Sequence, residues 1–141
     1  MKLYKIVIDT NVLLSALFSS KGASYKLLKL VGSEKFRIVL SVPLVLEYEE
    51  VAVRNVDKTE LSIDEIEDII DYLCSISEHK EIFYLWRPFL KDPDDDMLLE
   101  LAVSAACNVI VTYNKNDFKG IDKFGIQVMT AKEFLEEIGE L

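Results

Sequence analysis

The chain has 141 residues, of which 50% are hydrophobic and 29% are charged, with only 5 glycines and 3 prolines. This length favours a single domain over residues 1–141, and the composition excludes collagen-like, low-complexity and fully disordered chains. The 25 acidic residues outnumber the 16 lysines and arginines, and the net charge of −9 argues against non-specific wrapping of duplex DNA and against anchoring on anionic lipid.

Short apolar runs predict the strands of a mainly parallel sheet. Ile6–Ile8 is a run of β-branched residues, which is typical of a strand that is buried on both faces. Further runs lie at residues 36–40, 82–84, 109–112 and 126–128. The run at 82–84 predicts only a brief strand.

Helical patterns separate these strands. Predicted helices cover residues 12–18, 23–31, 42–54, 63–73, 97–107 and 131–138. Ser41, Ser62 and Thr130 are predicted N-caps, and the last two have a glutamate three residues later, as in a capping box. Alternating strands and helices without a linker predict a three-layer α/β/α sandwich on a mainly parallel sheet of four to five strands.

The cysteines and the first residues bear on the compartment. Cys74 and Cys107 are far apart and form no Cys-x-x-Cys pair, which argues against a zinc site or a disulfide framework. Asp9 interrupts the first apolar run too early for a signal peptide, and no later run reaches the length of a membrane span. We therefore expect a cytoplasmic protein with no membrane partner.

Carboxylates follow the predicted strands. Asp9 ends the first strand, Glu47 lies in the helix after the second, Asp95 begins a later helix and Asp117 follows the strand at 109–112. In open α/β sheets, the site lies at the carboxyl ends of the strands. Clustered carboxylates without arginine partners favour a hard divalent cation, Mg²⁺ or Mn²⁺, which generates hydroxide for phosphodiester hydrolysis.

Helix periodicity sorts the acids within each cluster. Asp95 shares a face with Leu98 and Ala102, so it is predicted to point inward, whereas Asp96 aligns with Glu100 on a face predicted to be solvated. Glu47 falls in the apolar half of its helix.

Each of these acids also has a simpler interpretation. Asp9 suits a helix N-cap, the acids at 94–96 suit the positive end of a helix dipole, and Glu47 suits a helix surface. Thr10 and Asn11 are as readily turn residues as functional ones.

Four segments together resemble a known family. Residues 6–13, the helix with Glu47, residues 91–102 and residues 109–118 look like the PIN domain, and more narrowly like the toxin of bacterial and archaeal toxin–antitoxin pairs, which include VapC-like ribonucleases. The resemblance covers essentially the whole chain, in order. It implies Mg²⁺- or Mn²⁺-dependent cleavage of single-stranded RNA and an antitoxin partner. It also suggests a homodimer, with a monomer as the alternative.

The resemblance also assigns roles to individual residues. It implies that Asp9, Glu47, Asp95 and Asp117 are the acidic quartet that holds the metal and cleaves. Supporting polar positions fall on Thr10, Asn11, Thr112 and Asn114. Many relatives carry Asp at the position of Asn114, so the fourth acid is displaced here to Asp117.

Three side chains beside the expected site are candidates for RNA contact: Tyr113, Lys115 and Lys119. A solvated lysine loop and a tyrosine packed beneath it are the alternative interpretation. The alternative function is a non-catalytic module with the same fold that binds RNA or protein. A receiver-like phosphoacceptor domain is disfavoured because paired acids after the first strand and a lysine after a late strand are not evident.

Overall fold

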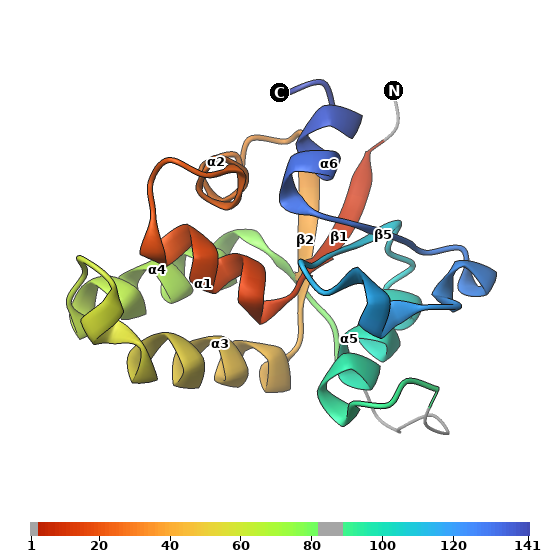
Figure 1. Cartoon of the computed structure of the whole chain (residues 1–141), viewed down its shortest axis with the longest axis horizontal. Helices are drawn as coiled ribbons and strands as arrows, with labels where there is room; N and C mark the ends of the chain where they lie inside the picture. The colour runs from red at the N-terminus through yellow and green to blue at the C-terminus, as the bar shows by residue number, and fades with distance from the viewer. Residues whose placement is uncertain (1–2, 82–88) are drawn as a thin grey trace.

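A computed structural model describes residues 3–81 and 89–141 of the chain, and its secondary structure alternates between strands and helices (Figure 1). In chain order the elements are β1 (Tyr4–Ile8), α1 (Thr10–Phe18), α2 (Ala23–Lys29), β2 (Phe36–Leu40), α3 (Val42–Arg54), η1 (Val56–Lys58), α4 (Ile63–Ile76), β3 (Glu78–His79), α5 (Pro93–Ser104), β4 (Val109–Val111), η2 (Lys115–Phe118), η3 (Ile121–Phe124), β5 (Gln127–Met129) and α6 (Ala131–Glu137), where η marks a 3₁₀ helix.

The strands that the structure describes form one parallel sheet in the order β3-β2-β1-β4-β5. In the register of the central strands, Ile6 pairs with Ile38 of β2 and Ile8 pairs with Val111 of β4. Residues 6–8 and 109–111 are all buried, because helices cover both faces of the sheet. The predicted parallel sheet is confirmed.

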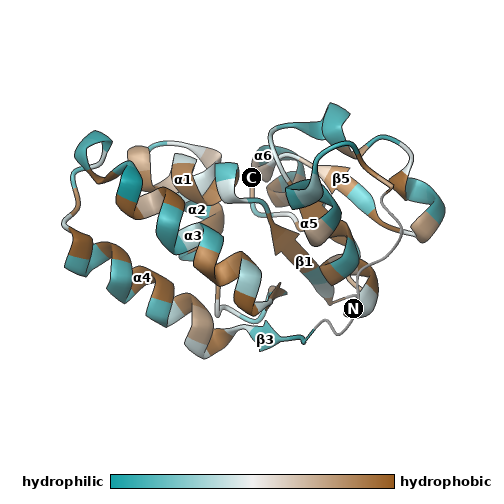
Figure 2. Cartoon of the chain, turned by 90° about the horizontal axis from the view of Figure 1, so that it is seen from below, coloured by the Kyte–Doolittle hydropathy of each residue, from teal (hydrophilic) through white to brown (hydrophobic). Residues whose placement is uncertain are grey.

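The helices form the two outer layers. Right-handed crossovers from β1 to β2 and from β2 to β3 place α1 to α4 on one face, and the reverse step from β3 to β4 places α5 on the other. Figures 1 and 2 show this separation, with α6 returning to lie against α2. This arrangement is the three-layer sandwich that the sequence predicts, and no described helix is long and apolar enough to span a bilayer.

Capping side chains fix where several helices begin. The Ser62 hydroxyl accepts a 3.1 Å hydrogen bond from the Glu65 amide, and the Glu65 carboxylate accepts one of 3.0 Å from the Ser62 amide. Thr130 forms the same capping box at α6, as predicted. Helix α5 begins at Pro93, before the predicted position, because Asp92 caps it by accepting a 2.9 Å bond from the Asp94 amide.

Two predictions about α5 are wrong. Glu100 was expected to face solvent, yet it is 3% exposed, since residues 98–102 are all buried where α5 packs against β1, β2 and β4. Asp96, expected on the same solvated face, is half-buried, and its Oδ1 accepts hydrogen bonds from the amides of Phe89 and Leu90. Helix α5 therefore has no face that is exposed to solvent along its whole length.

The predicted strand at 82–84 lies outside the described residues. The described sheet has β3 at one edge, where its Glu78 pairs with Val39 of β2, and β5 at the other. Both cysteines are free thiols, with Cys107 buried and Cys74 partly buried.

Candidate active site

The candidate site lies where the strand order of the sheet reverses. From β1 the chain crosses to β2 on one side, and β4 returns on the other side of β1. Asp9 follows β1, Thr112 follows β4, and the Asp9 amide donates a 2.9 Å hydrogen bond to the Val111 carbonyl. This switch point is the place where side chains can enter a crevice at the carboxyl edge of a parallel sheet.

The Asp9 side chain points toward β4. It accepts a 2.7 Å hydrogen bond at Oδ2 from the Thr112 hydroxyl. Although Asp9 occupies the N-cap position of α1, its side chain makes no capping hydrogen bond. The helix-cap interpretation of this carboxylate is therefore not supported, and the carboxylate is oriented by the neighbouring strand.

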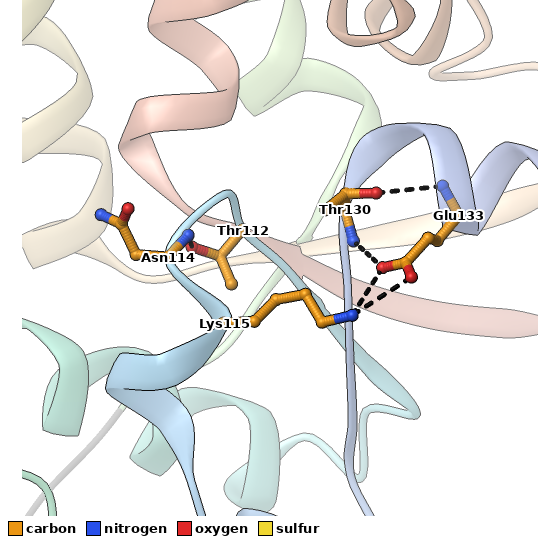
Figure 3. Close-up of polar contacts among 5 residues, drawn as sticks. All are labelled: Thr112, Asn114, Lys115, Thr130 and Glu133. Carbon is orange, nitrogen blue, oxygen red and sulfur yellow. Dashed lines mark hydrogen bonds and ion pairs between the residues drawn. The ribbon is translucent and has the colours of Figure 1, made fainter.

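Hydrogen bonds to the Thr112 side chain connect the loops around Asp9. Its hydroxyl, in a fully buried side chain, accepts hydrogen bonds from the Asn11 side-chain amide (3.4 Å) and the Asn114 backbone amide (3.1 Å). Figure 3 shows Asn114 against Thr112, and the Oδ1 of Asn11 accepts a bond from the Tyr113 amide (3.3 Å). These polar residues hold the loops after β1 and β4 together.

Glu47 reaches the crevice from α3. Its Oε2 accepts a 2.8 Å hydrogen bond from the hydroxyl of Thr10, the first residue of α1. The next residue, Tyr48, is buried, and its hydroxyl donates to the Ile8 carbonyl at the end of β1. Tyr48 thus anchors α3 to β1 beside Glu47, a role that the apolar pattern of the helix did not reveal.

Asp95 and Asp117 line the same cleft. A cleft of about 490 Å³ is lined by both carboxylates, by Asp92 and by Lys119. Asp95 comes from the first turn of α5 and Asp117 from η2. Asp92, the residue before Pro93, therefore also contributes charge to this cleft.

The carboxylates influence one another electrostatically. Burial raises the pKa of Asp9, which the hydrogen bond from Thr112 opposes and the charge of Asp117 reinforces. Burial likewise raises the pKa of Glu47, which the hydrogen bond from Thr10 opposes. Both acids thus lie in surroundings that disfavour an uncompensated negative charge.

Asp95 shows the strongest effect of the group. Burial, and then the charges of Asp9, Asp92, Asp117 and Asp94, raise its pKa to about 7. The fold therefore brings Asp95 near Asp9 and Asp117. Glu47 also lies near enough to Asp9 for the charge of Asp9 to raise its pKa. Four separate segments of the chain supply these acids. We refer to Asp9, Glu47, Asp95 and Asp117 as the acidic crevice.

The donor chemistry of the acidic crevice suits a hard divalent cation. None of the ion pairs among the described residues involves these four acids, and Lys119 lines the cleft of Asp95 and Asp117 without pairing with either of them. Within residues 3–81 and 89–141, no three His, Cys, Asp or Glu side chains are placed to hold a metal ion as they stand. Like charges repel one another, which favours keeping the carboxylates apart when no cation lies between them. Carboxylate oxygens are the ligands that Mg²⁺ and Mn²⁺ prefer.

The basic and aromatic candidates differ in their positions. Lys115 donates from Nζ to both carboxylate oxygens of Glu133, at 2.9 and 3.1 Å, and Figure 3 shows it extended toward α6. Lys119 lines the cleft with Asp95. The Tyr113 ring is 42% exposed, and its hydroxyl is hydrogen-bonded to the Ser24 hydroxyl.

Comparisons with known proteins agree with this architecture. A model of the PIN domain matches residues 5–116. Over 144 residues the chain is 28% identical to Uncharacterized protein MJ1680 of Methanocaldococcus jannaschii, covering 94% of this chain and 90% of that protein.

Two solved structures share the fold. The first is VapBC2 from Rickettsia felis bound to a DNA fragment from their promoter, with a TM-score of 0.57 and 15% identity over 89% of this chain and 98% of that chain. The second is VapBC-1 from nontypeable Haemophilus influenzae, with a TM-score of 0.58 and 16% identity over 91% of this chain and 98% of that chain.

Proposed function

Because the chain belongs to the PIN domain family, we propose that it is a metal-dependent endoribonuclease that cleaves single-stranded RNA. The observation that carries this proposal is the acidic crevice, in which the charge of Asp117 raises the pKa of Asp9, and the charges of Asp9 and Asp117 raise the pKa of Asp95. No ion pair among the described residues offsets these charges. Maintaining such a cluster costs stability unless a cation binds there. A catalytic site explains that cost better than a structural role does.

Each acidic side chain has a distinct task in this proposal. Asp9 and Asp95 would hold a Mg²⁺ or Mn²⁺ ion, with Asp117 and Glu47 completing its surroundings. Such an ion, when bound, polarises the phosphoryl oxygens and lowers the pKa of a water molecule. Thr112 orients Asp9, and Thr10 orients Glu47, through the hydrogen bonds that their hydroxyls donate.

The same proposal includes a protein partner. Two solved structures that share this fold are VapBC assemblies, and the sequence itself resembles the toxins of toxin–antitoxin pairs. We infer that this chain acts as such a toxin and that an antitoxin restrains it. Co-expression with the product of a small adjacent gene, followed by co-purification and loss of cleavage, tests this part.

Cleavage of a labelled single-stranded RNA tests the enzymatic part. We expect cleavage with Mg²⁺ or Mn²⁺, none with a chelator, and a loss of about 100-fold or more in Asp9→Asn or Asp95→Asn, since a metal ion supplies several kcal/mol of transition-state stabilisation. Asp68→Asn, an exposed acid of α4, is the matched control. Cleavage that survives chelation and both substitutions contradicts the proposal and favours a non-catalytic binding module.

A further inference from the structure

A second hollow lies between α2 and α6, away from the acidic crevice. Its volume is about 650 Å³, and it is lined by residues of α2, of the loop before it and of α6. Figure 1 shows these two helices next to each other on one face of the sheet. Four lysines contribute to its walls: Lys21, Lys26, Lys29 and Lys132. We call this hollow the lysine groove.

The lysines of the groove, which Leu141 also lines, form no ion pair with any residue that the structure describes. No Asp or Glu side chain is among the described residues that line it. None of its lysines takes part in an ion pair within residues 3–81 and 89–141, whereas Lys35 and Lys115 are paired with glutamates. In a chain with a net charge of −9, a groove lined by four unpaired lysines is a local site for an anion.

Hydrogen bonds link the N-terminal part of α2, a helix that lines the lysine groove, to the loop after β4 that carries Tyr113. Ser24 of α2 is hydrogen-bonded to the Tyr113 hydroxyl, and the Tyr113 amide donates to Asn11. Asn11 in turn contacts Thr112, which holds Asp9. A strand leaving the crevice across the exposed Tyr113 ring would therefore approach the N-terminal end of α2 and the lysines beyond it.

We propose that the lysine groove binds the backbone of the RNA strand that flanks the cleavage point. Lysines in a groove neutralise successive phosphates, and aromatic rings beside them accept stacked bases. Tyr25 lines the groove, with Lys29 Nζ 5.7 Å from its ring centre, and Tyr113 lies on the path to the crevice. This combination of lysine and tyrosine favours single-stranded RNA over an acidic protein segment. The proposal rests on the proposed function, because it extends the same substrate.

RNA binding without divalent metal tests this proposal independently of cleavage. Fluorescence anisotropy of a labelled single-stranded RNA is measured in chelator over a range of salt concentrations. Replacing all four lysines with glutamine is expected to lower affinity about tenfold or more and to reduce the salt slope by about 2 to 3, because each phosphate contact contributes about 0.7. Replacing them with arginine is expected to keep both values near those of the wild type.

A charge-matched control separates the groove from net charge. The variant Arg37→Gln, Arg54→Gln, Lys58→Gln, Lys80→Gln removes the same number of exposed positive charges elsewhere, and it should bind RNA nearly as the wild type does. Equal losses in the two variants, or no loss in the groove variant, overturn the proposal. Displacement of the RNA by polyglutamate as effectively as by unlabelled RNA also overturns it, in favour of an acidic protein segment.

Cleavage by the wild type distinguishes failure of the two proposals. Metal-dependent cleavage without lysine-dependent binding contradicts only the proposal that the lysine groove binds RNA. Lysine-dependent binding without any cleavage supports the lysine groove as an RNA-binding site and contradicts the proposal that the protein is a ribonuclease. Thermal unfolding of each variant confirms that the fold is intact before binding is compared.

Discussion

The Thr112 hydroxyl donates a 2.7 Å hydrogen bond to Oδ2 of Asp9, and it thereby joins the ends of two adjacent parallel strands. This bond orients a partly buried carboxylate at the point where the strand order of the sheet reverses. A group that orients a metal-binding carboxylate contributes to metal affinity and activity without touching the metal itself.

Replacing Thr112 with valine tests this orienting role. Valine keeps the shape of the side chain and removes the donor to Asp9 and the acceptor for Asn11. We expect metal affinity or cleavage to fall by about 10- to 100-fold. Thr112→Ser retains the hydroxyl and should restore most of the loss, measured by Mn²⁺ titration and by cleavage rate. A valine variant with unchanged Mn²⁺ affinity and rate contradicts the orienting role.

Binding of a divalent cation should stabilise the folded chain. Added Mg²⁺ or Mn²⁺ binds the native acidic crevice more strongly than the unfolded chain, so the melting temperature should rise with metal concentration. Differential scanning fluorimetry is the measurement. Asp95→Asn should abolish most of the shift, while Asp68→Asn on the exposed face of α4 should keep it. An identical shift of the melting temperature in both variants would show that the cation binds outside the acidic crevice.

Stability without metal should depend on pH through Asp95. Burial and the charges of its neighbours raise the pKa of Asp95 from 3.8 to about 7, so the folded state holds this proton more tightly than the unfolded state does. The carboxyl costs no stability below its unfolded pKa, and the cost grows as pH rises toward 7. In chelator, Asp95→Asn should therefore raise the melting temperature more at pH 8 than at pH 5. An equal increment at both pH values is the contradictory result.

The two lysines beside the crevice should differ in their effect on substrate. Lys119 lines the cleft with Asp95 and Asp117, whereas Lys115 is engaged with Glu133. We expect Lys119→Gln to raise KM for RNA and Lys115→Gln to leave KM nearly unchanged. Because the Lys115 ion pair is exposed, its loss should cost only about 0–1 kcal/mol of stability. Steady-state kinetics and chemical denaturation check both expectations, and a larger KM effect from Lys115 contradicts them.

The fourth acidic position can be assigned by a pair of substitutions. Asp117 raises the pKa of Asp9 and Asp95 by its charge, and it lines the same cleft as Asp95. The backbone amide of Asn114 instead donates to Thr112. Asp117→Asn should therefore lower cleavage about 10-fold or more, on the scale of one lost interaction of roughly 1.4 kcal/mol, and Asn114→Ala should lower it less. The reverse order would assign the position to Asn114.

Much of this site follows from local sequence. Asp9 and Thr112 were expected near each other, because buried β-branched runs predict parallel strands whose carboxyl ends share one edge. Ser62 and Thr130 were found from capping-box spacing, which depends on residues only three apart. These features depend on neighbours in sequence, or on a topology with few alternatives.

Other features depend on neighbours that are remote in sequence. The burial of Glu100 follows from the packing of α5 against three strands, which periodicity within the helix does not encode. The ion pair of Lys115 requires Glu133, which lies on a separate helix. The lysine groove likewise combines α2 with Lys132, more than a hundred residues later. Tertiary packing, and not local pattern, determines these contacts.

The proposed function requires that the acidic crevice binds a divalent cation. A crystal grown with Mn²⁺ and measured with anomalous scattering tests it most directly. We expect an anomalous peak at about 2 Å from carboxylate oxygens of Asp9 and Asp95, within reach of Asp117. A map with no peak in the crevice, or with Mn²⁺ only at the exposed acids of α4, would contradict it.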